Sequence, residues 1–300
     1  MSKLGVLIWR HIFESGDEKR IAQQNPDISD LDIIKDIPYI DDHERGHLLD
    51  IYRRKDAGQN SPVMINIHGG GLFASYKEVN AHFNYEITKM GYTVISISYR
   101  RIPETTLWHQ IDDVMAALRF IHDHADEWKI NLNDLYISGD SAGALLSVFA
   151  ISLNNNKGLQ EIFGIKGADL HFKAAAFISI MLDTQRRDLM MALSNVVTGK
   201  EDKGKTYERF LKNPSLLVRY AQLPPSILFT SEEDLIQKDS LKFEQLLQEH
   251  CVDYEIHNYP KGEENELVHV FSVMYPEYKE SREVYHFIDS FYKKEGNKNG

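Results

Sequence analysis

The residue best suited to chemistry in this sequence is Ser141, at the centre of Gly139-Asp140-Ser141-Ala142-Gly143. The apolar residues 135–138 before it are typical of a buried strand, and residues 144–150 after it are typical of a helix. Small residues permit a tight turn between strand and helix that exposes the serine hydroxyl, so this context predicts a nucleophile at Ser141. The alternative is a serine that merely caps the helix.

A serine hydroxyl becomes a good nucleophile when a base removes its proton, and the base needs an acid that orients it. Where both follow the serine along the chain, they lie at the ends of later strands. Three carboxylates, the last of them Asp234, follow the predicted strand at residues 226–230. We favour Asp234, because the chain continues from it into a helix, and keep Glu233 as the second choice. Asp234 could instead only cap the helix that begins near Gln237.

Four histidines lie downstream of Asp234 and compete for the role of base. His250 ends a predicted helix, His257 lies within a predicted strand and His286 lies in the middle of the last helix. Only His269 falls in the loop between the last strand and the last helix, where the base is expected. The sequence therefore predicts His269 as the general base.

A glycine-rich loop directly after a buried strand, His68-Gly69-Gly70-Gly71, is suited to binding an oxyanion. Acyl transfer requires backbone N–H donors that are placed in advance, and glycines let the backbone approach a substrate closely. We expect Gly70 and Gly71 to donate together with Ala142, the residue after the nucleophile. His68 is predicted to brace this loop and not to act as a base.

The elements that must position these residues alternate between strands and helices after residue 35, which indicates a mostly parallel sheet covered on both faces. The first two strands are expected to pair antiparallel through a turn at residues 44–46. Strands are predicted at 36–40, 47–53, 63–67, 93–99, 135–138, 174–180, 226–230 and 254–259. Helices are predicted at 78–90, 107–124, 144–153, 237–250 and 277–292. Residues 181–224 are charged and helical in pattern, which indicates an insertion over one end of the sheet.

The composition excludes several classes of protein. A net charge of −11 argues against a nucleic-acid surface, and the single cysteine excludes an internal disulfide and a cysteine-based zinc site. The apolar residues 4–9 are shorter than a signal-peptide core, and no stretch approaches the ~20 apolar residues of a membrane span. We expect a soluble cytoplasmic protein that begins with a short amphipathic helix and acts on a small molecule. A homodimer is left open.

One segment matches a metal-binding motif but lacks the structural context that the motif requires. His43-Glu44-Arg45-Gly46-His47 matches the zinc-protease pattern H-E-x-x-H, which requires both histidines on one helix face. Here the flanks resemble strands and Gly46 marks a turn, so no metal site is predicted. The sequence also contains no phosphate-binding loop with its lysine and no dinucleotide fingerprint, so no cofactor is expected.

The glycine-rich loop and the Gly139–Gly143 motif together resemble the hormone-sensitive-lipase-like branch of the α/β-hydrolases, which includes many bacterial carboxylesterases. The resemblance covers about residues 60–290, with further matches at residues 99–104, 113–118 and 269–271. It implies one α/β-hydrolase domain over residues 1–300, with an eight-stranded, mostly parallel sheet and helices on both faces. It also implies a helical cap, formed by about residues 1–35 and 181–224.

The resemblance implies a serine carboxylesterase that uses a Ser141–His269–Asp234 triad on small or medium acyl esters. Two alternatives remain open. The same machinery could hydrolyse an amide, formamide or peptide, because fold and triad do not fix the substrate. The chain could also be a non-catalytic binding protein that has kept the fold.

Overall fold

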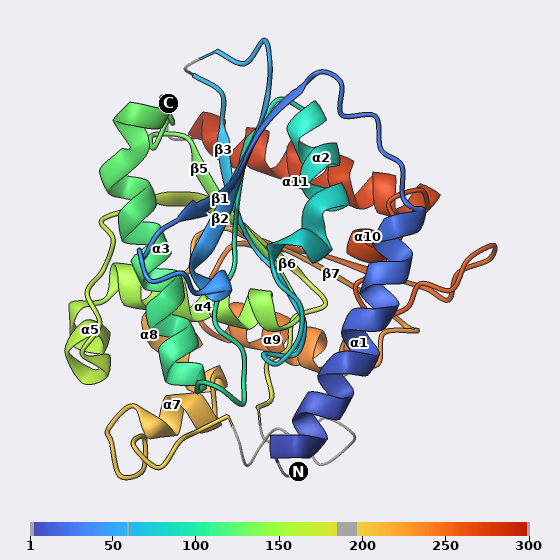
Figure 1. Ribbon diagram of the computed structural model, residues 1–300. Coiled ribbons are helices and arrows are strands. Elements are labelled where there is room, and N and C mark those ends of the chain that lie inside the picture. The colour runs from blue at the N-terminus through green and yellow to red at the C-terminus, as the bar shows by residue number, and fades with distance from the viewer. Residues whose placement is uncertain (1–2, 59, 185–196, 299–300) are drawn as a thin grey trace.

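The computed structural model describes residues 3–58, 60–184 and 197–298, and its centre is a single eight-stranded sheet (Figure 1). The strands lie in the order β1-β2-β4-β3-β5-β6-β7-β8. β2 pairs antiparallel with β1 and β4, and all other neighbours are parallel. The strands are β1 (Leu31–Pro38), β2 (Leu48–Arg54), β3 (Val63–Ile67), β4 (Thr93–Ile97), β5 (Leu135–Asp140), β6 (Phe172–Ile178), β7 (Ser226–Ser231) and β8 (Tyr254–Tyr259).

Helices cover both faces of this sheet, as the alternating sequence pattern predicts (Figure 1). Two short 3₁₀ turns, η1 (Arg45–His47) and η2 (Lys77–Asn80), precede β2 and α2. The helices are α1 (Lys3–Gln23), α2 (Ala81–Lys89), α3 (Leu107–Trp128), α4 (Ala142–Asn155), α5 (Lys157–Phe163), α7 (Glu208–Lys212), α8 (Ser215–Ala221), α9 (Gln237–Glu249), α10 (Phe271–Met274) and α11 (Lys279–Lys298).

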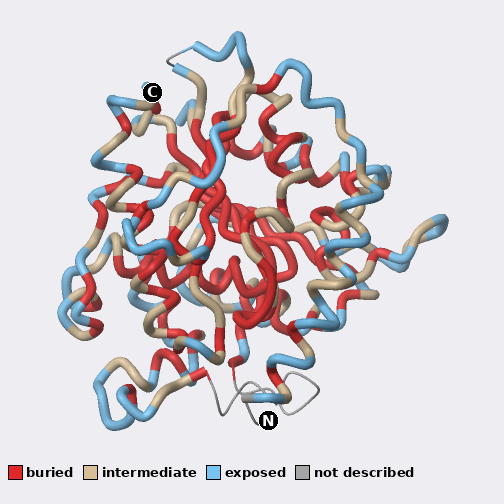
Figure 2. The backbone as a smooth tube through the Cα atoms, viewed as in Figure 1, coloured by how far each residue is buried: buried red, intermediate tan, exposed pale blue. Residues whose placement is uncertain are grey.

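The core consists of two apolar clusters, one on each face of the sheet. Figure 2 shows that the buried residues gather along the central strands. Successive strand side chains point to opposite faces, so Val94 of β4 joins one cluster and Ile95 joins the other. One cluster packs the sheet against α3, α4, α8 and α9, and the other packs it against α2, α10 and α11. Because the central strands are covered on both faces, they are mostly apolar, and all five residues of β3 are buried.

The first helix, α1, is tied to the loops above the sheet by buried polar contacts. The guanidinium of Arg10 donates to the carbonyl oxygens of Phe73 (2.6 Å) and Ile102 (2.5 Å) and forms an ion pair with Glu104 at 2.6 Å. Glu14 accepts a hydrogen bond from the backbone N–H of Ser75 at 3.0 Å. These contacts hold one face of α1 against the carboxyl ends of the strands.

The predicted eight-stranded, mostly parallel sheet is confirmed, and its boundaries differ from the predictions in a few places. The N-terminal helix is 21 residues long and not short. β1 begins at Leu31, so residues 31–35 belong to the sheet and not to a helical segment. α5 was not predicted. Within the predicted insertion at 181–224, residues 185–196 lie outside the described part of the chain, and the described remainder contains α7 and α8.

Candidate active site

The turn between β5 and α4 holds Ser141 in a rare backbone conformation, with φ 49° and ψ −115°. No side-chain hydrogen bond caps α4 at this residue, so the serine hydroxyl does not serve as a helix cap. The turn can close only because its neighbours are small: a Cβ atom at Gly143 would lie 2.0 Å from the carbonyl oxygen of Ile67 on β3. The strained turn thus leaves the hydroxyl free to point away from the helix.

A continuous chain of hydrogen bonds links the three residues that the sequence predicts as a triad. Nε2 of His269 lies 2.9 Å from Oγ of Ser141, and Nδ1 of His269 lies 2.8 Å from Oδ1 of Asp234. His269 stands in the loop between β8 and α10, as its sequence position predicts. An acid, an imidazole and a hydroxyl in this order can activate the hydroxyl as a nucleophile.

The two candidate acids, Asp234 and Glu233, have different hydrogen-bond partners. Asp234 is buried, and although burial opposes its ionisation, the hydrogen bond and charge of His269 hold its pKa below the usual value. The N-cap of α9 is Ile236, so Asp234 is not the cap of that helix. Glu233 instead accepts hydrogen bonds from the backbone N–H groups of Gly262 (3.1 Å) and Leu267 (2.8 Å). Glu233 therefore fixes the loop that leads to His269.

The glycine-rich loop lies beside the serine and presents unpaired backbone donors. Among the described residues, none accepts a hydrogen bond from the N–H groups of Gly70, Gly71 or Ala142. Gly70 has a φ of +112°, and a Cβ atom there would lie 2.2 Å from the carbonyl oxygen of Ala74. Only glycine fits this position, which accounts for the loop sequence. Donors of this kind can bind an oxygen that gains negative charge.

His68 is wholly buried beneath this loop. Its ring stacks on the ring of Tyr99 at 4.4 Å, and its Nδ1–H donates to the carbonyl oxygen of Gly69 at 2.6 Å. Burial lowers the pKa of His68 to about 4, so the imidazole is neutral at pH 7. This side chain therefore carries the glycine loop and has no contact with Ser141.

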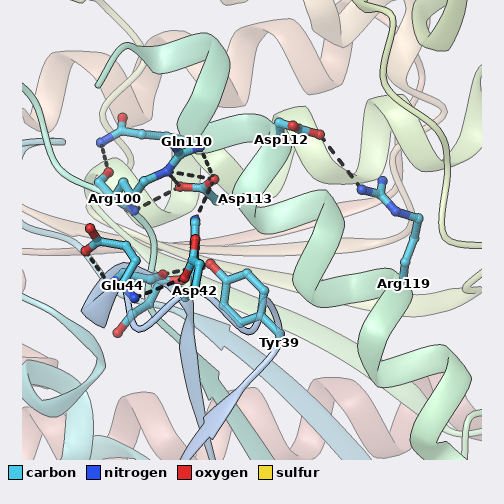
Figure 3. Close-up of polar contacts among 11 residues, drawn as sticks. Tyr39, Asp42, Glu44, Arg100, Gln110, Asp112, Asp113 and Arg119 are labelled. Atoms are coloured by element: carbon cyan, nitrogen blue, oxygen red, sulfur yellow. Dashed lines mark hydrogen bonds and ion pairs between the residues drawn. The ribbon is translucent and has the colours of Figure 1, made fainter. Parts of the chain in front are cut away.

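A second layer of polar contacts holds the segment that supports the loop (Figure 3). Gln110 of α3 donates from Nε2 to the carbonyl oxygens of Leu72 and Arg100, both at 2.7 Å. The Arg100 guanidinium forms an ion pair with Asp113 at 2.6 Å. Leu72 directly follows the glycine loop, so this hydrogen bond from α3 fixes the end of the loop. Nothing in the local sequence marks Gln110 for this role.

His47, the second histidine of the H-E-x-x-H pattern, belongs to the same network of polar contacts. Nδ1 of His47 lies 2.8 Å from Asp42, and Nε2 lies 3.2 Å from Asp113. Although burial acts in the opposite direction, the two carboxylates raise the pKa of His47. Among the described residues, no group of three histidine, cysteine or acidic side chains is arranged to hold a metal ion.

A pocket of about 170 Å³ opens above Ser141. Apolar side chains line much of it, among them Phe13 of α1, Phe73 and Val273. The pocket also contacts the glycine loop, His269 and the carboxyl group of Asp140. The presence of Phe13 shows that α1 forms one wall of this pocket.

Asp140 is buried between the serine and the glycine loop. Its Oδ1 accepts hydrogen bonds from the backbone N–H of Gly69 (3.0 Å) and from Nδ2 of Asn80 (2.7 Å). Burial outweighs these bonds and raises the pKa of Asp140 from 3.8 to about 6. Because ionisation is harder in the folded state, Asp140 stabilises the fold most below pH 3.8, and that contribution is lost as the pH rises through 6.

Replacing Asp140 by asparagine should therefore stabilise the protein at pH 8, by up to about 3 kcal/mol for a pKa difference of this size. Asparagine keeps an oxygen that can accept both hydrogen bonds and carries no charge. The gain in unfolding free energy should shrink to about half at pH 5, because Asp140 is then mostly protonated in the folded wild type. Urea unfolding of both proteins at the two pH values measures this difference. A gain that does not vary with pH would contradict the assignment.

Comparisons with known proteins show which proteins the chain is similar to. A family model described as BD-FAE matches residues 49–234, more than half of the chain. The esterase LipQ of Mycobacterium tuberculosis is 31% identical over 175 residues, which are 57% of this chain and 38% of LipQ. An acetyl esterase of Salmonella typhi is 26% identical over 203 residues, 65% of this chain and 62% of that protein. The matches thus span only 38% to 62% of the length of these two curated relatives.

Solved structures resemble the chain over nearly its whole length. Esterase B from Lactobacillus rhamnosis superposes with a TM-score of 0.91 at 23% identity, covering 99% of this chain and 95% of that one. A hyperthermophilic esterase from Pyrobaculum calidifontis superposes with a TM-score of 0.74 at 22% identity, covering 96% and 93%. In the described part of the chain, no helix is both long and apolar enough to cross a membrane.

Proposed function

Because the chain belongs to the BD-FAE family and has the α/β-hydrolase fold, we propose that it is a serine carboxylesterase. The observation that carries this proposal is the unbroken hydrogen-bonded chain from Asp234 through His269 to Ser141. Unpaired backbone donors beside the serine and a largely apolar pocket above it support the same function. The curated relatives are themselves called esterases or carboxylic ester hydrolases.

In the proposed mechanism, Oγ of Ser141 attacks the ester carbonyl carbon while Nε2 of His269 takes the serine proton. The N–H groups of Gly70, Gly71 and Ala142 bind the oxyanion of the tetrahedral intermediate. His269 then gives its proton to the leaving alkoxide, which departs as the alcohol and leaves an acyl-serine. Water, deprotonated by His269, attacks the acyl carbon, and the imidazolium returns this proton to Oγ of Ser141 as the acid is released. Asp234 stabilises the imidazolium during both half-reactions.

We propose small to medium acyl groups for this chain. The pocket above Ser141 measures about 170 Å³, below the 300–1,000 Å³ typical of drug-sized ligands. One structure of the Lactobacillus rhamnosis esterase carries a tributyrin phosphonate inhibitor, whose acyl groups have four carbons. The wall formed by α1 supports the proposal that it belongs to a helical cap, to which the described parts of residues 181–224 would also contribute.

A matched panel of substrates tests the reaction class. We expect p-nitrophenyl butyrate to be hydrolysed at least ~100-fold faster, in kcat/KM, than the corresponding butyryl anilide. An anilide nitrogen needs protonation before it departs, whereas p-nitrophenolate leaves readily. An esterase should also cleave ethyl butyrate, because His269 can protonate the ethoxide as it leaves. Comparable rates for ethyl butyrate and unactivated amides would favour an amidase. No turnover together with no labelling by a fluorophosphonate probe would favour a binding protein.

A further inference from the structure

The pocket above Ser141 continues into a second cavity that the proposed chemistry does not yet use. This groove measures about 610 Å³ and lies between α1 and the end of α10, which stand side by side in Figure 1. Four residues line both cavities, namely Phe13, Asp17 and Arg20 of α1 and Met274 of α10. The groove and the pocket therefore meet at these four residues, which form a neck between them.

Hydrogen bonds hold the neck in place. Asp17 accepts from Oγ of Ser75 at 2.8 Å and from the guanidinium of Arg20 at 3.1 Å. Arg20 also donates to the carbonyl oxygen of Met274 at 3.3 Å, and Gln24 donates to the same oxygen at 3.0 Å. These bonds tie α1 both to the loop after the glycines and to α10. The boundary between the two cavities is thus held by defined contacts.

One stripe of α1 forms a side of the groove. Its residues recur three or four positions apart, as residues on one helix face do. They are Trp9, Ile12, Phe13, Gly16, Lys19, Arg20 and Gln23. Ile12 and Phe13 are 53% and 45% exposed, so this face presents apolar surface that no described residue covers fully. An apolar chain lying in the groove would remove that surface from water.

Gly16 lies in the middle of this stripe and leaves a notch in it. No atom lies within 4 Å of the position that a Cβ atom would take there, so the space is open. Glycine in a helix interior costs about 1 kcal/mol relative to alanine. Neither steric crowding nor a positive φ requires glycine at this position. A larger side chain at position 16 would occupy part of the groove.

The position of His269 says which part of a substrate would enter the groove. His269 must give its proton to the leaving oxygen, so the alcohol part lies on the side of His269. The chain runs from His269 through Val270 and Val273 to Met274, all of which line the pocket, and Met274 forms the neck. The groove is therefore on the alcohol side of the scissile bond.

We propose that this groove binds the alcohol part of the substrate, and that the protein prefers esters of short acids with extended, largely apolar alcohols. This proposal rests on the proposed esterase function and names its substrate class. The acyl group occupies the small pocket above Ser141, and the alcohol passes the Phe13–Met274 neck and lies along α1. Gly16 keeps the groove open for it.

Two isomeric esters test the proposal, because hexyl butyrate and ethyl octanoate have the same composition and differ only in which side is long. Each buried CH₂ group strengthens binding about fourfold, and four extra groups half-covered in an open groove should give about tenfold. We expect kcat/KM for hexyl butyrate to be about tenfold higher than that for ethyl octanoate. It should also be about tenfold higher than that for ethyl butyrate. A preference for ethyl octanoate would overturn the proposal.

Filling the notch provides the matched variants. Gly16→Phe should lower kcat/KM for hexyl butyrate about tenfold more than that for ethyl butyrate. Glu18→Ala, at an exposed position of α1 that lines neither cavity, is the control and should leave both values unchanged. Ile12→Ala removes apolar surface at a half-exposed position, where folding is not at risk, and should reduce the preference for hexyl butyrate about threefold. Equal losses on hexyl butyrate and ethyl octanoate in both Gly16→Phe and Ile12→Ala would overturn the groove assignment. No turnover of any ester by the wild type would instead refute the esterase function itself.

Discussion

Replacing Ser141 by alanine should lower ester turnover by at least about 10⁴-fold, because no other described hydroxyl contacts His269. The residual rate would come from the backbone donors and the pocket alone. The protein should fold normally, since the Ser141 side chain makes no cap contact with α4. Hydrolysis of p-nitrophenyl butyrate at substrate concentrations below KM measures the loss. Labelling with a fluorophosphonate probe should disappear in the same variant.

Ser147 offers a matched control on the same helix. Its hydroxyl is buried and donates only to the carbonyl oxygen of Gly143 at 2.9 Å, within α4. Ser147→Ala should therefore keep wild-type turnover and labelling. Retention of full ester hydrolysis in Ser141→Ala would remove this residue from the mechanism. The activity would then have to reside elsewhere in the chain.

The second large effect is expected at Asp234. Asp234→Asn should reduce kcat about 10⁴-fold with a much smaller change in KM, because the amide stabilises the wrong tautomer of His269. The substitution conserves the size of a buried side chain, so its effect is chemical and not steric. Oδ1 of Asp234 also accepts from the backbone N–H of Ile236 at 2.9 Å, so an amide nitrogen in this position would lose that contact as well. Steady-state kinetics and thermal melts together separate lost chemistry from lost folding.

Glu233→Gln is the control for this experiment, since the two acids are adjacent in sequence. Glutamine keeps an oxygen that can accept from Gly262 and Leu267, so the loop before His269 should hold its position. We expect kcat within about threefold of the wild type, as for a residue without contact to the reacting groups. If Glu233→Gln were the more damaging change, the choice of acid would have to be reversed.

The sequence predicts the fold and the candidate site best where a short segment must adopt a conformation that only certain residue types allow. The turn at Gly143 and the loop at Gly70 leave no room for a Cβ atom, so their glycines are visible as motifs in one dimension. The order of strands and helices follows from apolar patterns, and the predicted sheet is confirmed. The roles of Ser141 and His269 remain predictions that the geometry supports.

Other features of the site depend on contacts between distant segments and carry no local signal. Gln110 supports the end of the glycine loop from 38 residues away, and its neighbours in sequence resemble any amphipathic helix. Arg20 reaches Met274 across 254 residues of chain. Such pairings form only when the sheet has already set the spacing between helices. The choice between Asp234 and Glu233 depended in the same way on where His269 lies.

The position of α1 has a consequence for how such a protein can diversify. The helix precedes β1, adds no strand to the sheet, and yet supplies one wall of the pocket and one side of the groove. Arg10 and Glu14 anchor the helix, whereas Ile12 and Gly16 form a second set that faces the open space. Asp17 and Arg20 do both. Mutations in the second set can therefore alter the range of accepted alcohols while the reaction centre is left untouched.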